Sequence, residues 1–332
     1  MTKTPWFPVL VSLTVLFAIN ILMVSSVAPG SLVKQIIAWS IGVVLFFIGR
    51  FVNPKQIASS KWFIFIGSCL LLLLPILLNN ITRGSRRWID LGFTSIQPSE
   101  FVKPWLMLFL ANSPVPLLHL IPVGIIMLQP DLGSALSVLF LMAPVILYDK
   151  KLLKITLVLG IIFVILSPVI YNTVLHDYQK DRIINFINPS SDPLGKGYNV
   201  IQSKIAIGSG GFWGKGYKKG TQGQLLFLPE KHTDFMFAAT AEELGFIGII
   251  IILIAYFFLI KTLFNKAFLA KNNRVLFLFT LGIAMQIWMQ MFVNIGMNIG
   301  ILPVTGIPLP FLSVGGSSIM TLLFSIGIIY SS

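Results

Sequence analysis

Acidic residues and cysteine are scarce in this chain. Of its 332 residues only 11 are Asp or Glu, against 24 Lys or Arg, and Cys69 is the one cysteine. Because Cys69 lies inside an apolar run, a disulfide framework is excluded. The sequence also lacks a zinc-ligand spacing, a phosphate-binding P-loop and a Ser/His/Asp signature. These absences exclude disulfide-stabilised folds, zinc enzymes and P-loop NTPases.

Hydrophobic residues dominate instead. They make up 56% of the chain, charged residues make up 11%, and the mean hydropathy is +0.89. Such values are typical of polytopic membrane proteins. Windows of about 20 apolar residues predict about ten transmembrane helices, and hence an all-α integral membrane protein with a single domain over residues 1–332. The predicted spans are 8–27, 33–52, 62–78, 100–111, 117–128, 132–148, 152–171, 235–260, 275–297 and 315–330.

The basic residues predict the orientation of these helices. Most short loops rich in Lys and Arg share a side with the N-terminus, which the positive-inside rule makes cytoplasmic. An even number of spans places both termini on that side. The net charge of +13 favours anionic lipid headgroups or phosphate-bearing substrates as partners. A nucleic acid is not expected, because a chain of membrane spans offers it no groove.

A long external loop is predicted over residues 172–233. It exceeds the usual length of a connection, which marks it as functional. Two short helices are expected within it, at 181–188 and 198–207. The second would present Gln202 and Lys204 to a lipid headgroup.

Asp234 stands where this external loop re-enters apolar sequence. A charge at such a boundary is costly unless it is paired, hydrated or used. Two interpretations stay open, since Thr233 or Asp234 could cap the following helix and Asp234 could equally be a catalytic base. The segment 302–318, with three prolines and three glycines, predicts a broken re-entrant stretch before the last helix. It implies an outward cavity near Asp234.

Other polar groups lie inside the predicted spans. Glu100 and Lys103 are spaced to pair on one helix face, and a structural ion pair is favoured over a substrate site. Asp131 is placed to cap the sixth span. A polar stripe in the ninth span favours hydrogen bonding between helices over a wall that binds sugar hydroxyls. The stripe consists of Gln286, Gln290, Asn294 and Asn298.

Several motifs occur in order over nearly the whole chain. They are RWIDLG at 87–92, QPSE at 97–100 with Lys103, QPDLG at 129–133, GKGY at 195–198 with Gln202, PEKHTDF at 229–235, AEELG at 241–245, and NIGM at 294–297 running on to Gly316. Together they resemble the SEDS family of bacterial cell-wall proteins, named for shape, elongation, division and sporulation. The connection 300–310 is more similar to the elongation branch, RodA, than to the division branch, FtsW. Val314, where the family usually has Tyr, Pro104 after Lys103, and a short fourth-to-fifth connection depart from the family pattern.

This resemblance implies a peptidoglycan glycosyltransferase that polymerises lipid II at the outer face of the bacterial cytoplasmic membrane. A class B penicillin-binding protein, which is a transpeptidase, would be its protein partner, and membrane lipids would also contact it. Asp234 would be the general base for an inverting transfer in which the lipid pyrophosphate leaves without a general acid. No cofactor is identified with certainty, and a divalent cation, Mg²⁺ or Mn²⁺, stays open.

The resemblance also implies a set of substrate-binding residues on the outer side. They are Arg87, Trp88, Glu100, Lys103, Asp131, Arg182, Gln202, Lys204, Lys231 and His232. Two other functions fit the same spans, namely a lipid II flippase or transporter and a non-catalytic scaffold for a transpeptidase. The clustering of distinctive residues on one side favours the enzyme, because alternating access requires a site reached from both sides.

Overall fold

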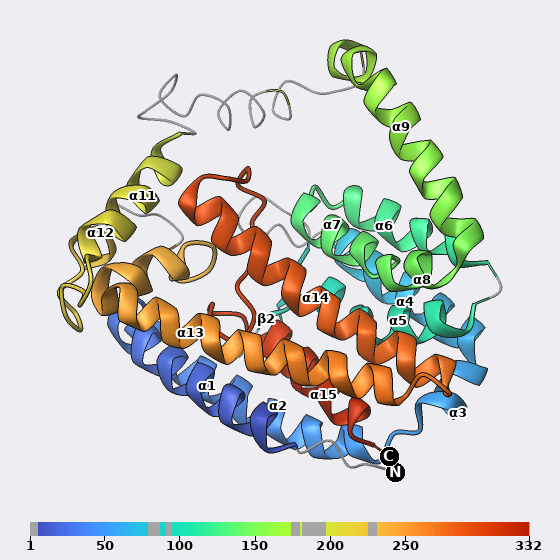
Figure 1. Cartoon of the computed structure of the whole chain (residues 1–332), viewed down its shortest axis with the longest axis horizontal. Coiled ribbons are helices and arrows are strands. Elements are labelled where there is room, and N and C mark those ends of the chain that lie inside the picture. The colour runs from blue at the N-terminus through green and yellow to red at the C-terminus, as the bar shows by residue number, and fades with distance from the viewer. Residues whose placement is uncertain are drawn as a thin grey trace.

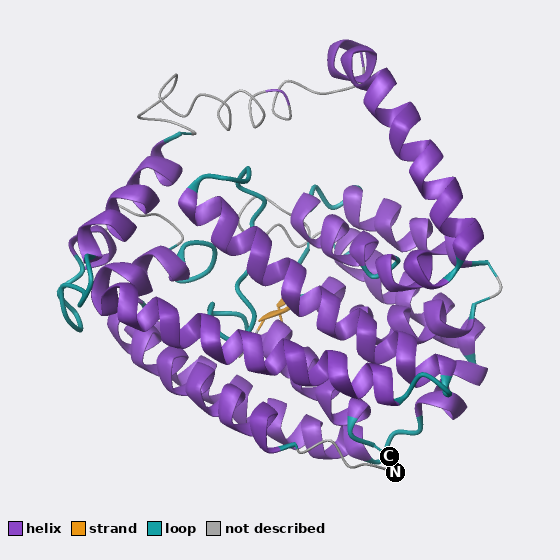
Figure 2. Ribbon diagram, viewed as in Figure 1, coloured by secondary structure: helices purple, strands orange, loops and turns teal. Residues whose placement is uncertain are grey.

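The structure, a computed structural model, describes residues 6–78, 87–90, 95–113, 115–173, 180, 197–224 and 231–331. Within this part a helix occupies each range predicted to span the membrane (Figure 2), so the prediction of an all-α membrane protein is confirmed. Five of the described helices are long and apolar enough to cross a membrane by themselves. They are α1 (Phe7–Val27), α2 (Leu32–Arg50, after the single turn η1 at Pro29–Ser31), α9 (Lys150–Thr173), α13 (Met236–Leu269) and α14 (Arg274–Ile299).

Shorter elements complete the bundle. The predicted sixth span is divided into two helices by a turn at Leu141 and Met142. The eighth continues past Ile260 to Leu269, because its lysines can extend from the apolar helix toward water. The shorter elements are α3 (Pro54–Ser59), α4 (Lys61–Leu77), α5 (Pro98–Asn112), η2 (Pro116–His119), α6 (Leu120–Met127), α7 (Leu132–Phe140), α8 (Ala143–Tyr148), α11 (Tyr198–Gly210), α12 (Thr221–Gln224), α15 (Gly316–Ile329), β1 (Ile89–Asp90) and β2 (Ser95–Ile96).

The helices α13 and α14 pack together through the centre of the bundle (Figure 1). Around them, α1 packs on α13, and α5 packs on α14. The pair α2 and α15 is held at backbone contact by glycine. A Cβ atom on Gly327 would lie 2.2 Å from the carbonyl oxygen of Phe46, and one on Gly49 would lie 2.6 Å from that of Phe324. Small residues at such contacts are what membrane helices use to approach closely.

Residues 300–315 form no helix, as the prolines and glycines predict. Polar side chains from four helices, α1, α2, α13 and α14, donate to backbone carbonyls of this broken segment. Asn20 Nδ2 donates to the carbonyl oxygen of Leu312 at 2.6 Å, and the Tyr256 hydroxyl donates to that of Pro310. The backbone has positive φ at Gly306 and at the buried Phe311. Protein groups therefore replace water around this stretch, which is the condition for irregular backbone at membrane depth.

The helix α13 is interrupted at Gly245, where φ is 67° and ψ is −166°. The loop after α11 fills the gap in the helical hydrogen bonding. Lys215 N donates to the carbonyl oxygen of Glu242 at 2.9 Å, and Phe246 N donates to that of Gly211 at 3.0 Å. A Cβ atom on Gly245 would lie 2.2 Å from the Gly214 nitrogen, so a larger residue cannot occupy this position. The sequence predicts one uninterrupted span here, and that prediction is wrong.

Two outer elements differ in how they pack. The predicted helix at 198–207 is present as α11, and it continues through the first glycines until Gly211, where φ is 58°. It packs on both α13 and α14. In contrast α9 projects from the bundle (Figure 1), and its side chains are exposed along most of its length. The second predicted loop helix, 181–188, lies outside the described residues.

Candidate active site

The turn at residues 231–235 carries Asp234 and leads into α13. Three consecutive carbonyl groups in this turn, at residues 232–234, are held by other elements. Val314 N donates to the carbonyl oxygen of His232 at 2.8 Å, and the Ser313 hydroxyl donates to that of Thr233. Both Asn294 and Asn298 donate through Nδ2 to the carbonyl oxygen of Asp234, at 3.0 Å each. The backbone under Asp234 is thus fixed from two sides.

The carboxylate of Asp234 is half-buried and lies against the broken segment. A Cβ atom on Gly306 would be 3.5 Å from Asp234 Oδ2. The residue at the N-cap of α13 is Phe235, with no side-chain cap hydrogen bond from it. Neither Thr233 nor Asp234 therefore occupies the N-cap position that one interpretation of the sequence gave them. Asp234 as a residue remains partly exposed, and a base has to be within reach of its substrate.

The predicted polar stripe of α14 serves hydrogen bonding between elements. Besides binding the Asp234 turn, Asn294 Nδ2 donates to the carbonyl oxygen of Ile307 at 2.8 Å. Asn298 Oδ1 accepts from Ala238 N at 3.2 Å, and the Asn298 carbonyl oxygen accepts from the Ser203 hydroxyl at 2.8 Å. These two buried asparagines join the broken segment, the start of α13 and α11 around Asp234. The contacts of Asn294 and Asn298 agree with the interhelical interpretation, and the sugar-binding wall stays a prediction.

Asp131 caps α7, as its position in the sequence predicts, and its carboxylate also forms an ion pair with Arg87. Its carboxylate accepts from Ser134 N at 3.1 Å and from the Ser134 hydroxyl at 2.7 Å. Gln97 Nε2 donates to it at 3.1 Å, and Arg87 Nη1 lies 3.3 Å from Oδ1. The start of α7 also touches the broken segment, since a Cβ atom on Gly133 would be 2.6 Å from the carbonyl oxygen of Thr305.

The pair Arg87 and Asp131 and the Asp234 carboxylate therefore approach the same part of the broken segment. Thr305 contacts α7, and the next residue, Gly306, contacts the Asp234 carboxylate. Among the described residues, Arg87 Nε and the Thr305 hydroxyl are buried without a hydrogen-bond partner. Unsatisfied donors next to a carboxylate are groups that a polar substrate can bind.

Glu100 and Lys103 form the predicted ion pair on α5. Lys103 Nζ lies 2.5 Å from Glu100 Oε1, and the two residues are 1% and 4% exposed respectively. The pair begins one turn after Gln97, which binds Asp131. The charges of Glu100 and Lys103 are committed to each other.

The remaining predicted site residues are more dispersed. Gln202 and Lys204 lie on α11, Gln202 half-buried and Lys204 exposed. A Cβ atom on Gly300 would be 2.5 Å from Lys204 Nζ, so the ammonium lies at the carboxyl end of α14, where a helix attracts cations. Trp88 is half-buried between Arg87 and β1. Arg182 lies outside the described residues.

Lys231 and His232 begin the turn that carries Asp234, and both are half-buried. The Lys231 ammonium donates to the carbonyl oxygen of Gly223. Burial lowers the pKa of Lys231 below its ordinary value, and the charge of Glu243 opposes that shift. The two residues flank Asp234, and Lys231 ties the turn to the loop before it.

Sequence reasoning missed the part played by Glu242, which is 0% exposed. Its carboxylate accepts from Lys215 Nζ at 2.7 Å, from the Thr221 hydroxyl at 2.9 Å and from the backbone N–H groups of Gln222 and Gly223 at 3.1 and 3.3 Å. This carboxylate fastens the loop 211–224 to α13. The available signal was an acid within an apolar helix, which requires a partner.

A metal centre built from protein side chains alone is not found in the described part of the chain, where no three His, Cys, Asp or Glu residues are grouped to hold an ion. A divalent cation would have to share its ligands with a substrate. The predicted Mg²⁺ or Mn²⁺ stays a prediction.

The fold and the site define a multi-pass helical membrane protein with a half-buried carboxylate braced at one end of its bundle. The chain belongs to the family of FtsW, RodA and SpoVE, described as cell cycle proteins, whose model matches residues 3–332. The suspected membership of the SEDS family is confirmed. A relative, the peptidoglycan glycosyltransferase MrdB of Escherichia coli K12, is 37% identical and covers 97% of this chain and 91% of its own.

Solved structures show the same arrangement. One chain, from a peptidoglycan synthase complex that coordinates polymerization and crosslinking, superposes with a TM-score of 0.84 at 32% identity. The match covers 99% of this chain and 97% of that one. The rod shape determining protein RodA of Thermus thermophilus superposes with a TM-score of 0.70 at 27% identity, over 100% and 97% of the two chains.

Proposed function

We propose that this chain is a peptidoglycan glycosyltransferase that polymerises lipid II at the outer face of the bacterial cytoplasmic membrane, with Asp234 as its general base. The activity class is the one for which the E. coli relative is named. One observation carries the assignment of the base. The Asp234 carboxylate is half-buried beside Gly306, on a turn whose carbonyl groups are bound from two sides.

In the proposed step the Asp234 carboxylate accepts the proton of the acceptor 4-hydroxyl as that oxygen attacks the anomeric carbon of the donor. The bond from the anomeric carbon to the lipid pyrophosphate breaks, and the pyrophosphate leaves with the electron pair. Such an anion needs no general acid, so one carboxylate suffices where a glycosidase uses two. Attack from the face opposite the leaving group inverts the anomeric centre.

The position of Asp234 supports this role because its backbone is preorganised. The hydrogen bonds from Asn294 and Asn298 to the Asp234 carbonyl oxygen use donors that are buried in α14. A base held within hydrogen-bond reach of its proton loses little free energy to reorientation.

Cations on the same side would bind the leaving group. Arg87, through its pair with Asp131, approaches the same part of the broken segment as Asp234, and it has a buried Nε without a hydrogen-bond partner in the described part of the protein. Lys204 and Lys231 lie on the α11 side of the same region. Fixed cations aimed at developing phosphate charge are the usual means of stabilising such a transition state. Lys103 would act through Glu100, since its ammonium is already paired.

A transpeptidase of the class B penicillin-binding type is the proposed partner. The peptidoglycan synthase complex described above coordinates polymerization and crosslinking, and this chain superposes on one chain of that complex over 99% of its own length. The proposed topology keeps both termini in the cytoplasm and places the Asp234 end of the bundle outside, in accordance with the positive-inside rule.

The proposal is tested with purified protein and labelled lipid II, comparing the wild type with Asp234→Asn. Asn retains the size of the side chain but cannot accept the proton, so polymerisation should fall by a factor on the order of 10²–10⁴. The control is Asp149→Asn, the same chemical change at the other end of the bundle, where Asp149 Oδ1 accepts from Lys151 N and Leu152 N. This control should polymerise as the wild type does.

Three results would contradict the proposal in different ways. If Asp234→Asn forms polymer at the wild-type rate, Asp234 is not the general base. Movement of lipid II between leaflets without polymer from the wild type would favour a flippase. A lower melting temperature for Asp234→Asn would assign the acid to the fold and not to the chemistry.

A further inference from the structure

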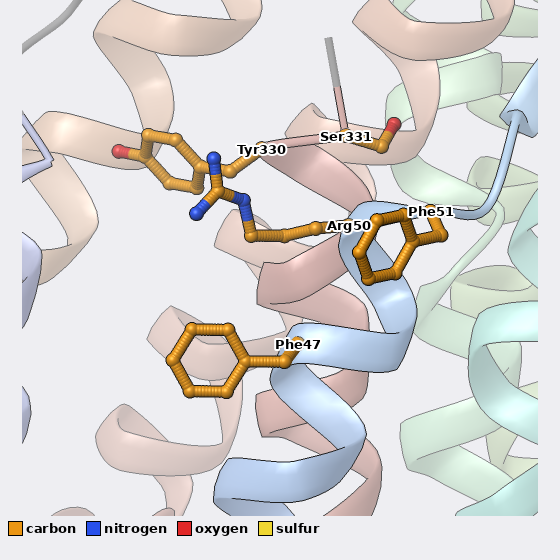
Figure 3. A pocket seen from close by; sticks show the side chains of 5 residues that line it. All are labelled: Phe47, Arg50, Phe51, Tyr330 and Ser331. Carbon is orange, nitrogen blue, oxygen red and sulfur yellow. The ribbon is translucent and has the colours of Figure 1, made fainter.

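A cavity lies at the opposite end of the bundle from Asp234. It has a volume of about 320 Å³ and is lined by residues from the end of α2 and the end of α15 (Figure 3). These residues are Phe47, Arg50, Phe51, Tyr330 and Ser331. The backbone contacts at Gly49 and Gly327 hold the two helices together directly beside the cavity. Its walls are therefore fixed by the fold.

The charge around this cavity is positive. Arg50 extends into it beside Tyr330 (Figure 3), and Lys266 Nζ lies 5.2 Å from the centroid of the Tyr330 ring. The residues that line the cavity, and Lys266, fall in residues 1–89 and 244–332, which contain no Asp or Glu. Within the described ranges no carboxylate forms an ion pair with Arg50 or Lys266. Two neighbouring cations without an acid favour an anionic ligand.

The same cavity has an apolar side. Phe47 and Phe51, one turn apart, are 54% and 91% exposed. On a helix that spans a membrane, such side chains face the hydrocarbon of the bilayer. Arg50 lies between them in the sequence, so cationic and apolar surfaces meet at one helix end. This arrangement matches a molecule with an anionic head and hydrocarbon tails.

We propose that this cavity binds the phosphate of an anionic phospholipid from the membrane leaflet at the α2 and α15 ends. Arg50 and Lys266 bind the phosphate, the Ser331 hydroxyl lies beside the headgroup, and Phe47 and Phe51 contact the acyl chains. The volume of about 320 Å³ falls at the lower end of the roughly 300–1,000 Å³ of ligand sites. Basic pockets between membrane helices are known to bind lipid headgroups in this way.

The test is native mass spectrometry of delipidated full-length protein in detergent, titrated with phosphatidylglycerol. Phosphatidylcholine has the same tails and phosphate but no net charge, and inorganic phosphate has no tails. The variants are Arg50→Gln, Lys266→Gln and their combination. The matched control is Lys261→Gln, since Lys261 lies on the same helix as Lys266 but over the Phe257 ring, which does not line the cavity, whereas Lys266 lies over Tyr330, which does.

Wild-type protein should retain phosphatidylglycerol in preference to phosphatidylcholine. Each variant should bind phosphatidylglycerol about fivefold more weakly, and the combination about 25-fold, which corresponds to about 1 kcal/mol per cation. Lys261→Gln should bind as the wild type does, and all variants should keep the wild-type melting temperature. Equal binding by wild type and double variant would overturn the proposal, as would displacement of the lipid by inorganic phosphate alone.

Discussion

The two ends of this helix bundle treat charge in opposite ways. At the end that carries Asp234, the carboxylates of Glu100 and Glu242 are buried and each is joined to a lysine. At the other end Lys261 and Lys266 lie over aromatic rings, at 5.5 and 5.2 Å from the centroids, in a part of the sequence without acids. At the first end charge is buried in ion pairs, whereas at the second end it lies against aromatic rings, on the exposed Lys261 and the half-buried Lys266.

This difference separates two uses of charge in a membrane protein. Burying an ion pair costs desolvation free energy, and removing one of its partners strongly destabilises the fold. Such pairs therefore fix the position of neighbouring groups. Surface cations contribute little to stability, but they orient the chain in the membrane and attract anionic lipids. Substitutions of lysine at the two ends should therefore have very different effects.

The largest effect is expected at Lys103. Lys103→Ala leaves the Glu100 carboxylate buried without its cation, which should lower the free energy of unfolding by about 3–5 kcal/mol. Thermal unfolding in detergent measures the loss as a lower melting temperature. The double variant Glu100→Leu with Lys103→Met should recover most of it, since neither charge remains. An unchanged melting temperature for Lys103→Ala would show that the ion pair with Glu100 does not contribute to the stability of the fold.

A smaller effect is expected at Glu242. Glu242→Gln keeps the volume but removes the charge that binds Lys215 and the backbone N–H groups of the loop 211–224. Stability should fall by about 1–3 kcal/mol, and proteases should cut the loop more readily. Gln222→Ala is the control, because it keeps the backbone N–H that Glu242 accepts. Equal protease resistance in both variants would mean that other contacts hold the loop.

The smallest effect is expected at Lys261. Lys261→Gln loses an exposed cation over the Phe257 ring, which should change the free energy of unfolding by at most about 0.5–1 kcal/mol. Chemical unfolding followed by tryptophan fluorescence measures the change. A loss as large as that of Lys103→Ala would show that the contrast between the two ends is wrong.

Much of the fold could be predicted because each membrane span is recorded in a local run of apolar residues. The spacing of Glu100 and Lys103 predicts their pairing, and the position of Asp131 predicts its cap, since both depend on residues within one turn. Asp234 could be singled out for the same reason, as an acid at an apolar boundary. The groups that hold it could not, because Asn294, Asn298 and Ser313 lie far along the chain.

The interruption of α13 could not be predicted for a related reason. Gly245 within an apolar run is compatible with an ordinary helix, and only the approach of Lys215 and Gly216 from the preceding loop makes it a break. The role of Glu242 depends on the same approach. Local sequence does not record which distant backbone groups will pair.

The break at Gly245 also determines how this end of the protein can move. The loop residues Gly211 to Gly216 and both sides of the break exchange backbone hydrogen bonds. Opening either segment therefore exposes the other, and the two should unfold locally as one cooperative unit. The short stretch of α13 from Met236 to Leu244 starts two residues after Asp234. A displacement of residues 211–216 would therefore shift this stretch relative to the rest of α13, and the change in direction would occur at Gly245.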